Sequence, residues 1–219
     1  MSRATPSRER RAAARLQFRA YRGPVTPTPD LVSIALAARA IAAPDARVAI
    51  AGVSGAGKTT LATRLSFVAG IPHTELDALH WGPDWTTRPE FMDDVRELVA
   101  RDRWITEWQY RAARATVIER ATLLVWLDVP FSTTLARAVR RTVRRRIRDE
   151  ELWNGNREPG IRHAVLRPDG VIRWAISTRR KYRALVAATR AKRPELPVLR
   201  LRTQRDVEAL IDAVSTTQD

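Results

Sequence analysis

The eight residues 52–59 read GVSGAGKT and fit the pattern G-x-x-x-x-G-K-[ST] in full. Its glycines allow a tight turn that brings backbone N–H groups against phosphate oxygens at a helix N-terminus. Lys58 can reach the β- and γ-phosphates, and the Thr59 hydroxyl can bind Mg²⁺. The motif therefore predicts a nucleoside triphosphate site, with ATP and Mg²⁺ as ligands. Its expected residues are Gly52, Ser54, Gly55, Ala56, Gly57, Lys58, Thr59 and Thr60.

The elements around this motif must place it at the end of a strand. The β-rich run at 47–52 precedes it and a helical pattern at 59–69 follows it. We expect further strands at 71–76, 103–108, 121–129 and 195–202. We expect a helix from Thr28 to about Pro44, with Thr28 as the cap before Pro29. Further helices are expected at 88–102, 131–148, 169–192 and 205–214. Alternating strands and helices predict a three-layer α/β fold, in which a five-stranded parallel sheet lies between helices.

The net charge of +15 is concentrated in three segments. Residues 1–24 carry seven Arg and one Glu, residues 137–158 carry eight Arg and four acids, and residues 172–193 carry eight basic residues and no acid. This distribution predicts anionic partners at particular places. We divide the chain into a flexible basic arm at 1–24 and one P-loop domain at 25–219. Base composition alone is an alternative reason for many surface arginines.

Other classes of site and location are disfavoured by composition. The chain has no Cys, so it lacks disulfides and thiolate chemistry, and its three His are too scattered for a zinc centre. We expect no membrane span, because no run of ~18 apolar residues occurs. The N-terminus has no apolar signal region, so we expect a cytoplasmic protein.

Several motifs narrow the class of phosphate-binding protein. The N-K-x-D motif of GTPases and an ABC-type signature are both missing from the sequence. The chain resembles the adenylate-kinase-like nucleoside and nucleotide kinases, in particular the bacterial small P-loop proteins labelled topology modulation or adenylate-kinase-related. The resemblance spans roughly 47–214 and rests on GVSGAGKTT, ELDALHW, WITEWQY, VWLDVP and LARAVRR. It implies an ATP- and Mg²⁺-dependent kinase that phosphorylates a small acceptor, such as a nucleoside or nucleotide.

The resemblance also implies roles for EWQYR at 107–111. Adenylate kinases carry D-G-x-x-R here, where the acid holds the magnesium shell and the arginine grips the acceptor phosphate. This chain has Glu107 and Arg111 at those positions, and Trp108 replaces the glycine. We therefore expect Glu107 to be a metal-shell and catalytic residue and Arg111 to bind the acceptor. The alternative for Glu107 is a solvated acid at a strand end.

Two further acids are expected at strand ends. Asp77 follows the second strand and, by the resemblance, lies where the acceptor binds, so it would orient a hydroxyl or join the metal's water shell. A helix N-cap is its alternative role. His80 would either line the acceptor pocket or serve only in the packing of neighbouring side chains. Asp128 ends an apolar strand, so it is a second metal candidate or a cap of the next helix.

A basic helix at 135–148 follows. At 100° per residue, one arc holds arginines and the opposite side is apolar, which predicts that the apolar side packs on the sheet. The arginines are Arg137, Arg140, Arg141, Arg144 and Arg148, and the apolar residues are Leu135, Val139, Val143 and Ile147. The resemblance places Arg137 and Arg141 on ATP, with Arg141 catalytic beside Lys58. A lid at about 142–160 would bring Arg157 over the phosphates, and a solvated basic helix is the alternative.

A second function stays open from the sequence. The basic arm and the two basic helices fit an ATP-binding regulator that binds nucleic acid. The chain shows no helix-turn-helix or RNA-recognition signature, so we favour a nucleoside triphosphate and a small acceptor as the partners.

Overall fold

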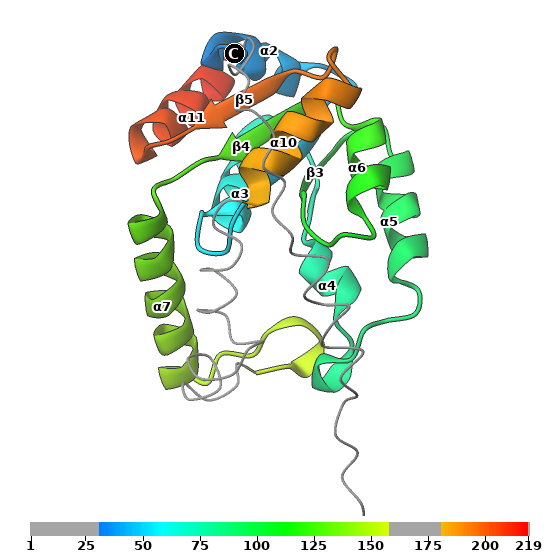
Figure 1. The fold of residues 1–219 in the computed structure, drawn as a ribbon, viewed down its shortest axis with the longest axis vertical. Helices are drawn as coiled ribbons and strands as arrows, with labels where there is room; N and C mark the ends of the chain where they lie inside the picture. The colour runs from blue at the N-terminus through cyan, green and yellow to red at the C-terminus, as the bar shows by residue number, and fades with distance from the viewer. Residues whose placement is uncertain (1–30, 158–180, 219) are drawn as a thin grey trace, which may run out of the picture.

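Five parallel strands form the centre of the molecule, in the order β2–β3–β1–β4–β5 (Figure 1). The computed structural model describes residues 31–157 and 181–218. The strands are β1 Arg47–Gly52, β2 His73–Thr74, β3 Trp104–Glu107, β4 Leu123–Leu127 and β5 Val198–Leu201. In the central register, Val48 of β1 pairs with Ile105 of β3 and with Leu123 of β4. The predicted three-layer α/β fold with a five-stranded parallel sheet is confirmed.

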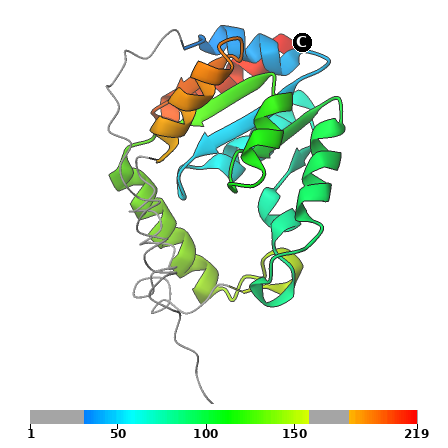
Figure 2. The ribbon, with the colours of Figure 1, turned by 45° about the vertical axis from the view of Figure 1, so that its right-hand side comes forward.

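Helices cover both faces of this sheet (Figures 1 and 2). The helices are α2 Ile34–Ala42, α3 Lys58–Ala69, α4 Leu76–His80, α5 Phe91–Ala100, α6 Arg114–Arg120, α7 Phe131–Ile147, α10 Lys181–Lys192 and α11 Gln204–Gln218, with 3-10 turns at η1 Pro83–Trp85 and η2 Trp153–Gly155. Helix α11 contacts both α2 and α3, whereas α5 contacts α6. Arg64 of α3 and Glu208 of α11 join two of these helices through hydrogen bonds of 2.9 and 2.6 Å.

The core lies on both sides of the central strands. Every residue of β4 is buried, and so are Val48 to Gly52 of β1. Strands that are covered on both faces need apolar side chains in both directions, which is why 121–129 is a near-continuous apolar run. The outer strand β2 has two residues instead of the predicted six, and its side chains are only half-buried.

The first described helix begins later than the sequence predicts. Residues 31–33 are not helical, and α2 starts at Ile34. Ser33 is its N-cap, because its hydroxyl accepts a hydrogen bond from the Leu36 N–H at 3.2 Å. The expected start at Thr28 is therefore wrong, although Thr28 itself lies outside the described residues.

Helix α7 packs differently from the prediction. Its buried residues are the small side chains Thr134, Ala138 and Thr142, spaced one turn apart. The apolar stripe that we expected to pack on the sheet instead lines an open groove on the helix, where Val139 is 36% and Ile147 is 76% exposed. Small residues at one-turn spacing let the phosphate-binding loop approach the helix backbone closely, so they determine which face turns inward.

Candidate active site

The phosphate-binding loop joins the end of β1 to the start of α3. Gly57 is the N-cap of α3 with a φ of +98°, and Gly55 has a φ of +79°, both in the left-handed region that favours glycine. The Ala56 N–H donates to the Val53 carbonyl at 3.1 Å and closes the turn. The loop therefore has the backbone shape that the motif predicts, at the carboxyl end of a central strand.

Helix α7 lies directly against this loop. A Cβ added at Gly55 would be 2.1 Å from the Thr134 carbonyl oxygen, so only glycine fits there. Arg141 reaches back from the same helix, and its Nη2 donates to the Ser54 Oγ at 3.2 Å. The structure thus brings Arg141 to the loop.

Arg137 lies on the other side of the loop. Its Nη1 would be 3.9 Å from a Cβ at Gly57, and its Nη2 donates to the Gln204 Oε1 at 3.3 Å. A cavity of about 520 Å³ opens beside it. The lining residues include Gly57, Thr60, Arg64, Arg137, Thr203 and Gln204. Thr60 and Arg137 therefore share one cavity with the N-terminus of α3.

Glu107 ends β3 and faces the first turn of α3. The Thr59 hydroxyl donates to its Oε1 at 2.8 Å, and His73 Nε2 lies 3.7 Å from the same oxygen. Burial alone would raise the pKa of Glu107, which is 2% exposed, but His73, Thr59 and Lys58 hold this pKa below its ordinary value. The alternative of a solvated acid is wrong, and Glu107 is a buried carboxylate at the loop.

Asp77 lies in the first turn of α4, where Glu75 takes the N-cap position. The alternative role of Asp77 as a helix N-cap is therefore wrong. Its Oδ1 accepts hydrogen bonds from the Tyr110 hydroxyl and, at 2.8 Å, from Gln109 Nε2. Burial raises the pKa of Asp77. Both of these hydrogen bonds go to Oδ1, and no hydrogen bond to Oδ2 is seen among residues 31–157 and 181–218.

Lys58 connects these groups. Its Nζ lies 3.5 Å from the Val53 carbonyl oxygen, and burial lowers the pKa of its ammonium group. Glu107 and Asp77 oppose that lowering, and Arg141 adds to it. The four residues predicted to be catalytic therefore lie within electrostatic reach of one another, although they come from α3, β3, α4 and α7.

His80, the last residue of α4, belongs to an aromatic cluster. Its ring centroid lies 3.9 Å from that of Tyr110, 4.7 Å from that of Phe91 and 4.6 Å from that of Trp81. Burial lowers the pKa of His80, which favours the neutral imidazole. The structure supports its packing role directly, and a contact between His80 and the acceptor stays a prediction.

Arg111 is exposed and lies among other cations. Burial lowers the pKa of Lys181, and the positive charges of Arg114 and Arg111 lower it further. Tyr182, the next residue of α10, donates from its hydroxyl to the Trp108 carbonyl at 3.0 Å. This group of cations therefore lies near the carboxyl end of β3. A contact between Arg111 and the acceptor stays a prediction.

Asp128 is engaged elsewhere. Its Oδ2 accepts hydrogen bonds from Arg200 Nε, at 2.9 Å, and from Arg200 Nη2, and Arg183 lies 3.8 Å away. An acid that pairs with guanidinium groups in this way ties β4 to β5. We therefore leave Asp128 out of the metal site proposed below.

The predicted lid is described only to residue 157. Arg157, which we expected over the phosphates, pairs instead with Asp149 of its own segment. The remaining lid residues, the basic arm at 1–24 and the predicted helix before Lys181 lie outside the described residues. The nucleic-acid alternative was based on that arm and on the two basic helices.

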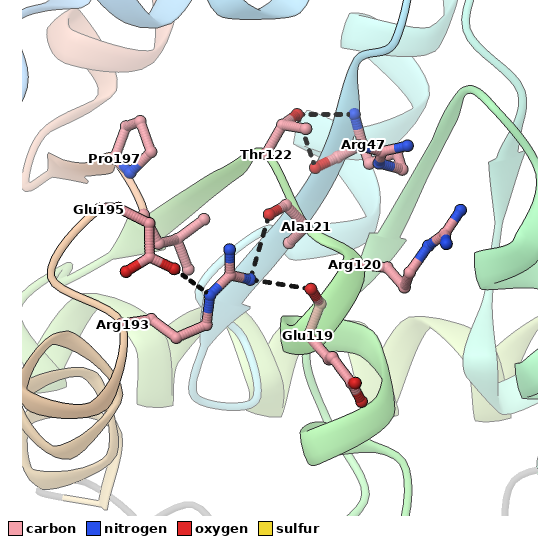
Figure 3. Close-up of a pocket in the computed structure, with 9 residues that line it drawn as sticks. Arg47, Glu119, Arg120, Ala121, Thr122, Arg193, Glu195 and Pro197 are labelled. Atoms are coloured by element: carbon pink, nitrogen blue, oxygen red, sulfur yellow. Dashed lines mark hydrogen bonds and ion pairs between the residues drawn. The ribbon is translucent and has the colours of Figure 1, made fainter.

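A second pocket, of about 270 Å³, lies at the opposite end of the sheet (Figure 3). Arg193 dominates it, donating from Nη1 to the Glu119 and Ala121 carbonyls at 3.0 and 3.4 Å and from Nε to Glu195 at 2.6 Å. An arginine on the last carbonyls of a helix satisfies groups that the helix leaves unpaired. This pocket is a structural junction between the ends of α6 and α10.

Sequence reasoning missed several residues of the site. His73 lies beside Glu107, and Gln109 bonds Asp77, but neither belongs to a recognisable motif. Their positions follow from the pairing of β2 with β3, which places His73 opposite Ile105. Two strand ends that lie far apart in the sequence meet only once that pairing is known.

The described residues contain no group of three or more His, Asp or Glu side chains arranged to hold a metal ion by themselves. Among residues 31–157 and 181–218, no helix has the length and apolar character needed to cross a bilayer.

Comparison with known proteins finds distant structural likeness alone. No protein-family model and no curated protein sequence matches the chain. A shikimate kinase from Acinetobacter baumannii in complex with shikimate has a TM-score of 0.48 at 16% identity, over 82% of this chain and 96% of that one.

A sugar kinase from Janibacter sp. HTCC2649 has a TM-score of 0.44 at 22% identity, over 79% of this chain and 94% of that one. A gluconokinase from Sinorhizobium meliloti 1021 has a TM-score of 0.42 at 16% identity, over 80% and 94%. An activity does not follow from likenesses this distant. What the chain itself shows is a parallel α/β fold with a phosphate-binding loop at the end of its first strand.

Proposed function

We propose that the protein is an ATP- and Mg²⁺-dependent phosphotransferase that acts on a hydroxyl of a small acceptor, such as a nucleoside or nucleotide. The observation that carries this proposal is the convergence of Glu107 and Arg141 on the loop that holds Lys58, through hydrogen bonds to Thr59 and Ser54, with Asp77 close enough to act on the charge of Lys58. Phosphoryl transfer depends on positioning and on neutralising charge, and this arrangement surrounds a phosphate-binding loop with both kinds of group.

The donor side consists of the loop, Lys58, Arg137 and Arg141. Backbone N–H groups at the start of α3 would bind the phosphate oxygens, and Lys58 would reach the transferred group. Arg141 already bonds Ser54 in the loop, so its guanidinium is placed to bind phosphate oxygens with little rearrangement. We assign the cavity beside Arg137 and Gln204 to the nucleoside part of ATP, because it adjoins the N-terminus of α3.

The residues present fit a magnesium ion. Mg²⁺ usually keeps several waters and binds one or two protein oxygens together with substrate phosphates. Thr59 Oγ1 and Glu107 lie together at the loop, and the buried Glu107 Oε2 has no hydrogen-bond partner among the described residues. When bound, the ion would neutralise charge on the β- and γ-phosphates. Glu107 would hold it directly or through water.

The acceptor side is built around Asp77. Tyr110 and Gln109 fix its Oδ1, which leaves Oδ2 to receive a hydrogen bond from the acceptor hydroxyl. The raised pKa of Asp77 moves this carboxylate toward the range in which a general base works best. By the resemblance to adenylate kinases, Arg111 would meet an anionic group of the acceptor.

A phosphotransfer screen tests the proposal. The wild-type protein with Mg·ATP is incubated with nucleosides, nucleotides and small hydroxylated metabolites, and phosphorylated products are measured. We expect transfer to at least one acceptor, and its loss in Lys58→Ala with the fold retained by circular dichroism. Calorimetry that detects no ATP or GTP binding to the folded protein in the presence of Mg²⁺ would refute the proposal, as would full activity in Lys58→Ala.

A further inference from the structure

Two loops of the same shape meet on the acceptor side of the site. One follows α4 and is closed by the antiparallel bridge between Trp81 and Thr87. The other follows α7 and is closed by the bridge between Glu151 and Arg157. Their 3-10 turns, η1 and η2, contact each other (Figure 2). We call the second loop, residues 151–157, the clamp loop.

Asn156 joins the two loops. It is 4% exposed, and its Oδ1 accepts the Trp85 backbone N–H at 2.8 Å. Its Nδ2 donates to the Gly82 carbonyl and to the Trp153 carbonyl, both at 2.8 Å. A buried backbone group that loses such a partner is costly, so this one side chain holds both turns in their observed relation.

The clamp loop also holds α4 at both ends. At the N-terminal end, Trp153 Nε1 donates to the Oε2 of Glu75, the N-cap residue, at 3.0 Å. At the C-terminal end, Asn154 Nδ2 donates to the Trp81 carbonyl and lies 3.5 Å from the Ala78 carbonyl oxygen. Because α4 has five residues, it is too short to be stable alone and depends on such contacts.

We propose that Trp153, Asn154 and Asn156 are positioning residues that clamp α4, and with it Asp77, against the acceptor. The inference deepens the proposed function, on which it rests for the role of Asp77. In the described part of the chain, none of the three side chains has a hydrogen bond to the phosphate-binding loop or to the Asp77 carboxylate, so they act through the helix that carries the carboxylate. The segment that follows the donor-side helix α7 thereby fixes the acceptor side of the same site.

Amide exchange followed by NMR tests the clamp without any substrate. The variants are Asn156→Ala and the milder Trp153→Phe, which removes the indole N–H and keeps an aromatic ring. Glu151→Ala is the matched control, because its exposed side chain pairs within the clamp loop alone. We expect at least tenfold faster exchange at the Trp85 amide in Asn156→Ala. Unchanged exchange there would overturn the contact.

The amide of Trp81, which donates to the Asp77 carbonyl at 3.1 Å, reports on α4 itself. We expect its exchange to rise in both Asn156→Ala and Trp153→Phe and to stay unchanged in Glu151→Ala. If Asn156→Ala does not fold, Trp153→Phe alone decides the outcome. Wild-type exchange at Trp81 in a folded Trp153→Phe protein would refute the clamping of α4 even if the protein is a kinase.

Kinetics with the acceptor identified by the screen separate positioning from general stability. We expect the KM for the acceptor to rise about tenfold in Asn156→Ala, while calorimetry gives an unchanged Kd for ATP. A rise in the Kd for ATP equal to the rise in the KM for the acceptor, or an unchanged KM, would contradict a positioning role. If no acceptor is found, the exchange measurements still decide whether the clamp exists, so the two proposals fail independently.

Discussion

Replacing Gly55 with alanine would show how far the phosphate-binding loop depends on α7. Gly55 has a φ of +79°, and a Cβ there would lie 2.1 Å from the Thr134 carbonyl oxygen. Real Cβ atoms stay about 3 Å or more from such atoms, so the α7 backbone would have to move by about 1 Å. Among the described elements, none packs extensively on α7, so we expect this helix to shift rather than the core to unfold.

Gly70 provides a matched control. It also has a left-handed φ, of +60°, but a Cβ there would meet nothing within 4 Å. Both alanine variants should lose about 1 kcal/mol of unfolding free energy from the strained backbone. In Gly55→Ala alone, the displaced helix would also carry Arg141 away from Ser54, to which it now bonds at 3.2 Å.

The expected consequence is a loss of ATP affinity that stability does not explain. A hydrogen bond to a charged group contributes about 1.5–3 kcal/mol, which corresponds to about tenfold to a hundredfold in Kd. Calorimetry with Mg·ATP and urea unfolding would be applied to both variants. We expect the larger Kd in Gly55→Ala and a wild-type Kd in Gly70→Ala. A Kd for Gly55→Ala within twofold of the wild type would refute the reasoning.

Three other substitutions test single roles in the site. Arg141→Ala should weaken ATP binding about tenfold in calorimetry, because it removes a cation at the loop. The control is Arg140→Ala, which changes the exposed neighbouring arginine and should bind ATP like the wild type. Asp77→Asn should abolish transfer yet raise stability at pH 7. Burial raises the pKa of Asp77 in the folded state above its ordinary value of 3.8. Ionisation of Asp77 therefore lowers the free energy of unfolding of the wild type as the pH rises above 3.8. Below that pH, the free energies of unfolding of the two proteins should converge. Glu107→Gln should remove the Mg²⁺ dependence of ATP binding, as measured by a magnesium titration. Asp128→Asn should leave that dependence intact and lower the free energy of unfolding, because it weakens the pair with Arg200. The opposite pattern would make Asp128 the metal residue and Glu107 the structural one.

Much of the fold follows from local pattern. The near-continuous apolar run at 121–129 and the strand–glycine–helix pattern at 47–69 predict β4, β1 and α3 correctly. Burial on both faces and the requirement for glycine leave direct traces in the sequence. Short elements were missed. Helix α4 has five residues and α6 has seven, too few for a hydrophobic period to become visible.

The inward face of α7 shows where periodicity misleads. An amphipathic pattern indicates that one face prefers to be covered, and we assigned Leu135, Val139, Val143 and Ile147 to the sheet. The helix instead turns Thr134, Ala138 and Thr142 inward, because the loop at Gly55 approaches its backbone too closely for larger side chains. Such a close approach depends on two segments that lie about 80 residues apart, so no local pattern records it.

The sequence by itself determined the loop between β1 and α3. The residues from Gly52 to Thr60 are contiguous, and their chemistry depends on a backbone turn that their own types require. The tertiary structure decided what surrounds this loop, because Glu107, Asp77 and Asn156 come from three separate segments and the sequence marked only Glu107 and Asp77 as candidates. Carboxylates at strand ends occur in many sequences, and strand order, the packing of α7 and the closure of the clamp loop select the ones that face the phosphate-binding loop.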